Sequence, residues 1–205
     1  MNCVLDLPNK KVIFMHVPKN GGISIRRGVF RVKEKFFGPE RLTTGEFKGF
    51  FKFGFVRNSY ARMVSCLHWA RKRFPDHFKW KNLSELLDIV EDRVIPYTFE
   101  GGEEWKKRGP DFYALARIRH HGIPQWHPYN CLQHADLVGR VENFQEDFDR
   151  VMRILDLPRK KAPHLNRTKH GHYSQYFSDS TRERVARLCA GEIKIFGFKF
   201  EEKSG

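Results

Sequence analysis

The sequence predicts an α/β protein with a single domain, in which a central, mostly parallel sheet is flanked by helices. Two observations support this prediction. The chain has 205 residues, a length that suits one domain with a core of its own. Short apolar runs rich in β-forming residues alternate along it with stretches of helical periodicity. Such alternation is typical of parallel sheets covered by helices on both faces. We therefore expect one domain over residues 1–205.

The first unit of this pattern is a strand, a glycine-containing loop and a helix. Residues 12–17 (VIFMHV) are mostly apolar and rich in β-formers, and Pro18 cannot continue the strand. From residue 23 to about residue 32, apolar side chains recur at the spacing of one helical face.

The second unit repeats the first. Residues 51–56 (FKFGFV) are predicted to form a strand that ends at Arg57, and residues 60–73 a helix. Because the carboxyl ends of parallel strands meet at one edge of a sheet, the loops after both strands should face the same crevice. The remaining expected elements are a strand over 136–141, helices over 83–90, 144–155 and 181–190, loops over 96–110 and 160–172, and a closing segment over 193–200.

Composition limits the class of protein. The chain is 40% hydrophobic and 14% aromatic, which is too apolar for a disordered chain. No apolar run approaches the roughly 20 residues of a membrane helix, and the first residues do not read as a secretory signal. The 38 Lys and Arg exceed the 24 Asp and Glu, giving a formal charge of +14. This excess predicts an anionic partner: nucleic acid, an anionic polymer, or a small molecule bearing phosphate or sulfate.

The cysteines and histidines do not predict a metal site. The 4 Cys are far apart and form no C-x-x-C pair, so neither a zinc site nor a disulfide framework is expected, and a reducing compartment is favoured. The 10 His include no H-E-x-x-H motif and have no Cys or acidic cluster at ligand spacing. We expect no metal cofactor.

The first motif with chemical meaning is residues 16–25 (HVPKNGGISI). Gly21 and Gly22 let the backbone approach an anion closely, and Lys19 and the Ser24 hydroxyl lie beside them. It is not the G-x-x-x-x-G-K-[ST] loop of nucleotide triphosphatases, because the lysine precedes the glycines. On its own, the pattern fits an ordinary strand-to-helix turn equally well.

The second motif is residues 55–65 (FVRNSYARMVS), in which Arg57 ends a strand and Ser65 lies eight positions further on. That spacing is about two helical turns. Together they could hold one phosphate, the arginine by charge-assisted hydrogen bonds and the serine by its hydroxyl. Taken alone, a strand-end arginine is more often a solvated charge, and a helix serine is usually incidental.

Together the two motifs resemble the phosphosulfate-binding and 3′-phosphate-binding segments of sulfotransferases that use 3′-phosphoadenosine 5′-phosphosulfate (PAPS), and the carbohydrate-type branch most closely. The resemblance continues in the same order through residues 136–144, 164–173 and 181–198. It implies the P-loop NTPase-like sulfotransferase fold. It also implies in-line transfer of the sulfuryl group from PAPS to a hydroxyl acceptor, a carbohydrate, with release of 3′-phosphoadenosine 5′-phosphate (PAP).

The resemblance also implies a role for individual residues. Lys19 would contact the bridging oxygen and the sulfonate, and so stabilise charge on the leaving phosphate. The loop after it would cradle the 5′-phosphate, and Arg57 with Ser65 would bind the 3′-phosphate. The expected nucleotide-binding residues are Lys19, Asn20, Gly21, Gly22, Ile23, Ser24, Arg57, Ser65 and, from a late loop closing over the nucleotide, Arg167 or Lys169.

The general base is where the sequence departs from the family. Many carbohydrate-type members carry a His between the two motifs and others a Glu, but residues 36–52 contain no His. Glu46 is the first candidate and Glu40 the second, although either fits a surface carboxylate. His68 is the third, and on an amphipathic helix it also fits a packed core residue. The missing His leaves open an altered acceptor, an unusual base or lost activity.

Two other functions were weighed. A basic nucleic-acid-binding protein without catalysis explains the charge but leaves both motifs as coincidence, and the common nucleic-acid-binding signatures are missing. A nucleotide kinase would need a P-loop Lys-Ser/Thr pair. We therefore do not expect nucleic acid as a partner. We also expect no membrane-spanning segment in the chain. Many eukaryotic relatives carry an N-terminal Golgi anchor, whereas this chain begins almost directly with its first strand. A cytoplasmic enzyme is expected, with a trimmed catalytic domain as the alternative.

Overall fold

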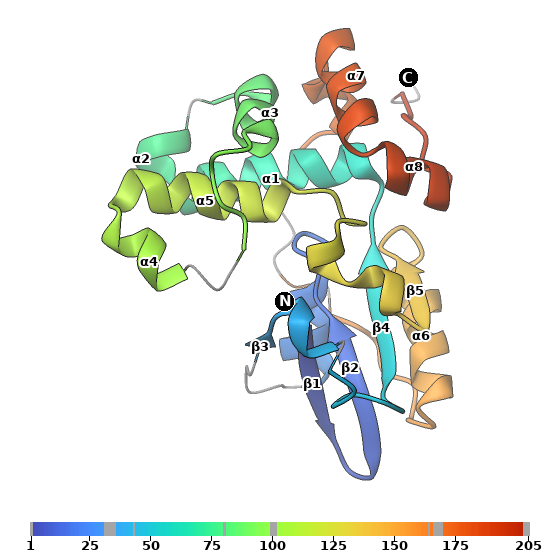
Figure 1. The fold of residues 1–205 in the computed structure, drawn as a ribbon. Helices are drawn as coiled ribbons and strands as arrows, with labels where there is room; N and C mark the ends of the chain where they lie inside the picture. The colour runs from blue at the N-terminus through green and yellow to red at the C-terminus, as the bar shows by residue number, and fades with distance from the viewer. Residues whose placement is uncertain are drawn as a thin grey trace. The chain divides into compact units, whose positions relative to one another are not determined.

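The fold is taken from a computed structural model of the chain (Figure 1). The structure describes residues 2–30, 36–42, 44–79, 81–98, 102–163, 165 and 170–202. The chain divides into two compact units, which are described separately. The sheet unit comprises Met1–Arg57 and Gln125–Arg167, and the helical unit comprises Asn58–Pro124 and Thr168–Gly205. One domain over residues 1–205 stays a prediction.

The sheet unit is built on the strands β1 (Asn2–Leu7), β2 (Lys10–Met15), β3 (Phe36–Phe37), β4 (Phe51–Val56) and β5 (Leu137–Arg140). They form one five-stranded sheet in the order β3-β1-β2-β4-β5. Strands β2, β4 and β5 are parallel, whereas β1 pairs antiparallel with both β2 and β3. The α/β class and the three predicted strands are confirmed.

The antiparallel edge of the sheet was not predicted. Strand β1 forms a hairpin with β2, and Leu7 pairs with Lys10 across a turn in which Asn9 has a left-handed φ of 58°. Along β1, Cys3 and Leu5 are buried while Val4 between them is exposed. Buried and exposed side chains thus alternate along β1, as they do in a half-buried strand. The alternation extends over only six residues.

One face of the sheet is covered by the π-helical turn η1 (Ser24–Val29) and by α6 (Phe144–Ile154), which follows β5 (Figure 1). In η1, the Phe30 N–H donates to the Ile25 carbonyl at 3.0 Å, the wider i to i+5 bond of a π-helix. The buried side chains of this face are Cys3, Leu5, Val12, Phe14, Ile25, Val29, Phe53, Phe55, Leu137, Phe148, Val151, Met152 and Leu155.

The other face of the sheet packs against the 3-10 turns η4 (Pro128–Asn130) and η5 (Leu132–His134). Their approach is closest at Gly54, where an added Cβ would lie 2.5 Å from Leu132 Cδ2 and 3.1 Å from the Met15 carbonyl oxygen. A side chain at this position of β4 would push the segment off the sheet.

The helical unit contains η6 (Tyr173–Tyr176) and the helices α1 (Ser59–Arg73), α2 (Pro75–Phe78), α3 (Leu83–Glu91), α4 (Gly102–Lys107), α5 (Pro110–Gly122), α7 (Asp179–Leu188) and α8 (Ala190–Phe196). Helices α1, α3, α5 and α7 share one core. Helix α1 begins at Asn58, whose Oδ1 accepts hydrogen bonds from the N–H groups of Tyr60 and Ala61. The predicted helices over 60–73, 83–90 and 181–190 are confirmed.

The loop predicted over 96–110 is partly wrong, because it contains α4, and the sequence analysis did not identify α5. Helix α4 is polar and follows a glycine, and it buries Trp105 while Glu103 and Lys106 form an ion pair at 2.5 Å. Helix α5 buries the small side chains Ala114 and Ala116 beside Ile118. Such residues give a weak hydrophobic period. Within the described residues, no helix is long and apolar enough to span a membrane.

Candidate functional site

The candidate site lies where β2 leaves the sheet. The parallel pairing of β2 with β4 ends at Met15 and Gly54, but β4 continues to Val56. On the other side, β5 stays paired to the end, since the Val141 N–H donates to the Val56 carbonyl at 2.8 Å. The backbone groups at the end of β4 that point toward β2 therefore extend past their strand partner. Buried backbone groups of this kind need another partner.

Two buried side-chain amides supply it. Asn20 Nδ2 donates to the Phe55 carbonyl at 2.7 Å and to Gln125 Oε1 at 2.7 Å. Gln125 Oε1 also accepts from the Arg57 N–H at 2.7 Å, and its Nε2 donates to the Arg57 carbonyl at 2.7 Å. Asn20 is 1% and Gln125 0% exposed. The two amides thus continue the hydrogen-bond ladder beyond the last residue of β2.

The loop between β2 and η1 has an unusual backbone. Lys19 and Gly21 both have a φ of 73°, in the left-handed region. This φ is rare for a residue with a side chain, and such strain persists where surrounding contacts hold it. Here the contacts are those of Asn20, which lies between Lys19 and Gly21 and is anchored to β4. Lys19 itself is partly exposed.

The two glycines of the loop lie against ring side chains. A Cβ on Gly22 would be 2.1 Å from His16 Cδ2, and a Cβ on Gly21 would be 3.0 Å from Phe144 Cε2. The His16 ring in turn stacks on Phe14, with ring centroids 5.9 Å apart. Close approach, as well as the positive φ of Gly21, therefore requires glycine in this loop.

The residues after the glycines enter η1. Ser24 is 3% exposed, and its Oγ accepts a hydrogen bond from the Leu165 N–H at 3.1 Å. Ile23 directly precedes η1 and is partly buried. The Ser24 hydroxyl hydrogen is a donor in addition to this accepted bond. The loop residues Lys19 to Ser24 and Arg57 are thus brought together at one end of the sheet unit by the Asn20 and Gln125 amides.

Three of the residues predicted to bind phosphate do not belong to the described part of the sheet unit. Ser65 is buried on α1 of the helical unit, and its role stays a prediction. Arg167 and Lys169 lie outside the described residues.

The carboxylate candidates for the general base follow β3. Phe37 pairs with Asn2, and Asn2 pairs with Met15, so β3 ends at the same sheet edge as β2. Glu40 is exposed on the 3-10 turn η2 (Pro39–Leu42). Glu46 is also exposed and pairs with Arg41, whose Nε donates at 3.0 Å. This side-chain hydrogen bond raises the pKa of Arg41.

His68 lies in the helical unit, half-buried on α1. Its ring stacks on His170 with centroids 4.7 Å apart and planes at 7°, and the Tyr176 ring meets it edge-on at 5.1 Å. These ring contacts are those of a packed side chain, which is the alternative role that the sequence left open for His68. The assignment of the general base to Glu46, Glu40 or His68 stays a prediction.

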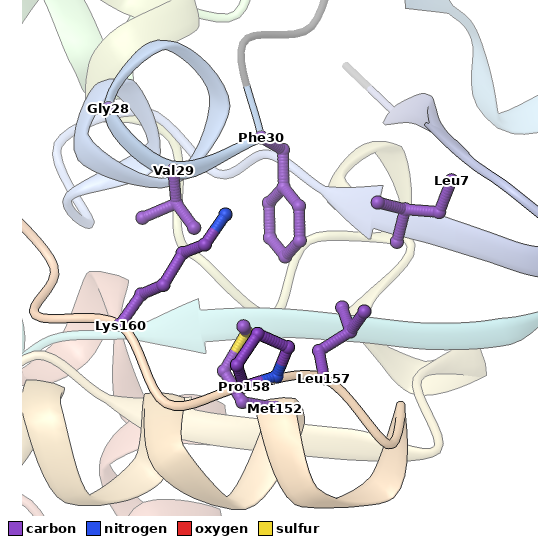
Figure 2. Close-up of a pocket in the computed structure, with 8 residues that line it drawn as sticks. All are labelled: Leu7, Gly28, Val29, Phe30, Met152, Leu157, Pro158 and Lys160. Carbon is purple, nitrogen blue, oxygen red and sulfur yellow. The ribbon is translucent and has the colours of Figure 1, made fainter.

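A cavity of about 580 Å³ in the sheet unit is separate from this loop. It lies near the β1–β2 hairpin turn, because Leu7 in its wall pairs with Lys10 at the start of β2. Figure 2 shows the Lys160 side chain reaching toward Val29 and Phe30 above Met152 and Pro158. Its walls are formed by Leu7, Gly28, Val29, Phe30, Met152, Leu157, Pro158 and Lys160.

Metal ligands are not gathered in the part of the chain that the structure describes: it contains no group of three His, Cys, Asp or Glu that could hold an ion. The loop, with Arg57, carries cations and hydrogen-bond donors instead of metal ligands. Lys19 and Arg57 are cations, and the Ser24 hydroxyl and the loop N–H groups are hydrogen-bond donors. Such a set suits an anion.

Gln125 is the residue that sequence reasoning missed. Its partners Asn20 and Arg57 are 105 and 68 positions away, so no local spacing marks it. A glutamine after Pro124 in an irregular segment carries no period or motif of its own.

Comparison with known proteins gave one finding. A family model described as "Sulfotransferase family" matches residues 4–199. No curated protein matched the chain. No solved structure matched it either.

The close packing of Gly22 on His16 leads to a testable prediction. Gly22→Ala should destabilise the protein by about 1–3 kcal/mol, because the imidazole must move to admit the methyl group. That corresponds to a fall in Tm of roughly 2–12 °C for a chain of this size. Thermal unfolding followed by circular dichroism measures it.

Gly191→Ala on α8 is the matched control, since an added Cβ there meets nothing within 4 Å. Its Tm should stay unchanged or rise slightly, because alanine is the better helix former. A Gly22→Ala protein as stable as the wild type would show that the loop does not lie on His16 as described.

Proposed function

Because the chain belongs to the sulfotransferase family, a family of transferases that move sulfuryl groups, we propose that it uses PAPS as donor and releases PAP. The observation that carries the proposal is the loop from Lys19 to Ser24. It is fixed to the end of β4 by the Asn20 and Gln125 amides, in the same unit as Arg57.

The donor set supports an anionic nucleotide. In the proposal, the backbone of Asn20, Gly21, Gly22 and Ile23, with the Ser24 hydroxyl, receives the 5′-phosphate. Arg57 receives the 3′-phosphate, since its backbone is held on both sides by Gln125 and its guanidinium can form charge-assisted hydrogen bonds. No carboxylate belongs to this group of residues, so nothing in it repels an anion.

Lys19 is proposed to act on the reacting atoms. In sulfuryl transfer the acceptor oxygen forms a bond to sulfur while the bond from sulfur to the phosphate oxygen breaks, leaving its electron pair on that oxygen. A fixed cation stabilises this developing charge without reorganisation. The left-handed backbone of Lys19, held by the anchoring of Asn20, fixes where its side chain begins. Positioning and charge stabilisation are the main contributions that a protein makes to such loose, in-line transfers.

The acceptor hydroxyl must lose its proton to a base. We propose Glu46 first and Glu40 second, because β3 brings their segment to the sheet edge at which the loop lies. Glu46 would have to give up its ion pair with Arg41 to accept a proton. His68 is kept as the third candidate from the sequence alone.

The acceptor and the location complete the proposal. A carbohydrate acceptor is supported by the resemblance to the carbohydrate-type branch and, for uronic or sulfated glycans, by the formal charge of +14. A cytoplasmic location is supported by the four cysteines, which are buried free thiols, the state that a reducing compartment maintains.

The first test is nucleotide binding. PAP at about 100 times its Kd should stabilise the fold by about 2.7 kcal/mol, or roughly 5–10 °C in Tm. AMP at the same concentration should give a smaller shift, because it lacks the group that Arg57 binds. Differential scanning fluorimetry measures both shifts. A folded sample that shows no shift with millimolar PAP would contradict the proposed donor.

The second test is the chemistry of Lys19. Lys19→Ala should lower turnover of radiolabelled PAPS by about 10²–10³, the scale for one preorganised group that stabilises charge. Its PAP affinity should fall much less. Lys10→Ala is the matched control, since it removes the same charge from the other end of the β2 segment. Equal losses in turnover and affinity would make Lys19 a binding residue only.

The same assay compares the bases. Among Glu46→Gln, Glu40→Gln and His68→Ala, one variant should lower the rate by about ten-fold or more, a threshold set below the roughly 10²–10⁴-fold that a general base contributes. If none does, all three assignments are wrong.

A further inference from the structure

We propose that Gln125 is a positioning residue of the transfer reaction: its amide fixes the spacing between the loop that receives the 5′-phosphate and the Arg57 that receives the 3′-phosphate. The inference rests on the proposed function. It assigns a role to a residue outside every segment that carried the family resemblance.

Gln125 contacts both phosphate-binding groups at once. Its Oε1 accepts from Asn20 Nδ2 and from the Arg57 N–H, both at 2.7 Å. Its Nε2 donates to the Arg57 carbonyl at 2.7 Å. All three bonds stay within the sheet unit, and the side chain is 0% exposed. Because the Gln125 side chain is buried, water does not compete for these hydrogen bonds. The bonds therefore hold Asn20 and the backbone of Arg57 firmly.

An amide is the chemical group that this position needs. One oxygen must accept two hydrogen bonds and a second atom must donate one, and only Asn and Gln carry an accepting oxygen and a donating nitrogen on the same uncharged group. A glutamate would keep the accepted bonds but lose the donated one. A methionine of similar length would keep none and would remove both hydrogen bonds that Gln125 makes to the backbone of Arg57.

The consequence for binding follows from the ligand. The two phosphates of PAP are joined through one ribose, so their separation varies little. A protein that already holds both subsites at that separation does not have to order them on binding. Asn20 has a second anchor, the Phe55 carbonyl, whereas the N–H and carbonyl of Arg57 are both bonded to Gln125. Loss of Gln125 should therefore disturb Arg57 more than the loop.

The experiment compares the affinities of wild type and Gln125→Met for PAP and AMP by isothermal titration calorimetry. AMP uses only the loop, whereas PAP uses the loop and Arg57. The preference for PAP over AMP should fall about ten-fold or more in Gln125→Met, since a displaced Arg57 loses charge-assisted hydrogen bonds to the 3′-phosphate. In that background Arg57→Ala should cost less PAP affinity than it does in the wild type, because contacting residues are not additive.

Gln145→Met is the matched control. Gln145 is also an amide of the sheet unit with three hydrogen bonds, to Asp149, Lys160 and Ala162, but it contacts neither Asn20 nor Arg57. It should lower Tm and leave the preference for PAP unchanged. Gln125→Asn, which keeps an amide but shortens it by one methylene, replaces Gln125→Met in the comparison if that variant does not fold.

The outcomes separate the two proposals. A wild type that does not bind PAP contradicts the proposed function. A wild type that binds PAP, with a Gln125 variant that loses stability but keeps the full preference over AMP, would overturn the positioning role and make Gln125 purely structural.

Discussion

The candidate site depends on one constraint: β2 ends before β4 does. An open α/β sheet binds ligands beyond the carboxyl ends of its strands, and a strand that stops early makes room there. It also leaves backbone groups of its neighbour without a partner, which is costly when they are buried. In this protein Asn20 and Gln125 replace the missing strand with two side-chain amides. Space is thus opened beyond the end of β2, while the Phe55 carbonyl and the N–H and carbonyl of Arg57 all keep hydrogen-bond partners.

The conformation of the loop follows from the same contacts. Asn20 donates to the Phe55 carbonyl from a sharply turning segment, in which its neighbours Lys19 and Gly21 both have a left-handed φ. The loop then lies on the His16 and Phe144 rings, where there is no room for side chains at Gly21 and Gly22. Strain at Lys19 is thus maintained by buried hydrogen bonds nearby, which is the usual condition for strain at a functional site.

The sequence predicted the elements whose signals are local. Residues 12–17 and 51–56 are short runs rich in apolar β-formers, and the structure has β2 at Lys10–Met15 and β4 at Phe51–Val56. The loop between β2 and η1 was predicted from its proline and glycines. Strand β1 was missed although Pro8 and Asn9 separate two β-rich runs, a hairpin signal that could have found it.

The parts that were missed depend on tertiary contacts. Gln125 hydrogen-bonds to partners 68 and 105 positions away, which no window of sequence brings together. Helix α5 buries alanines, so its helical period was weak. Glu46 was ranked by its place between two motifs, and only the structure shows it paired with Arg41.

The most direct test of this account is amide hydrogen exchange at Arg57, followed by NMR in the free protein. A backbone N–H held by a buried glutamine should exchange about 10² times more slowly than an unprotected amide, or slower still, as amides in stable core strands do. Gln125→Asn should remove most of that protection while the amide of Phe53, in the middle of β4, keeps its own. If the Arg57 amide of the wild type exchanges as fast as an unprotected peptide, the amide ladder beyond β2 does not exist in solution and the account is wrong.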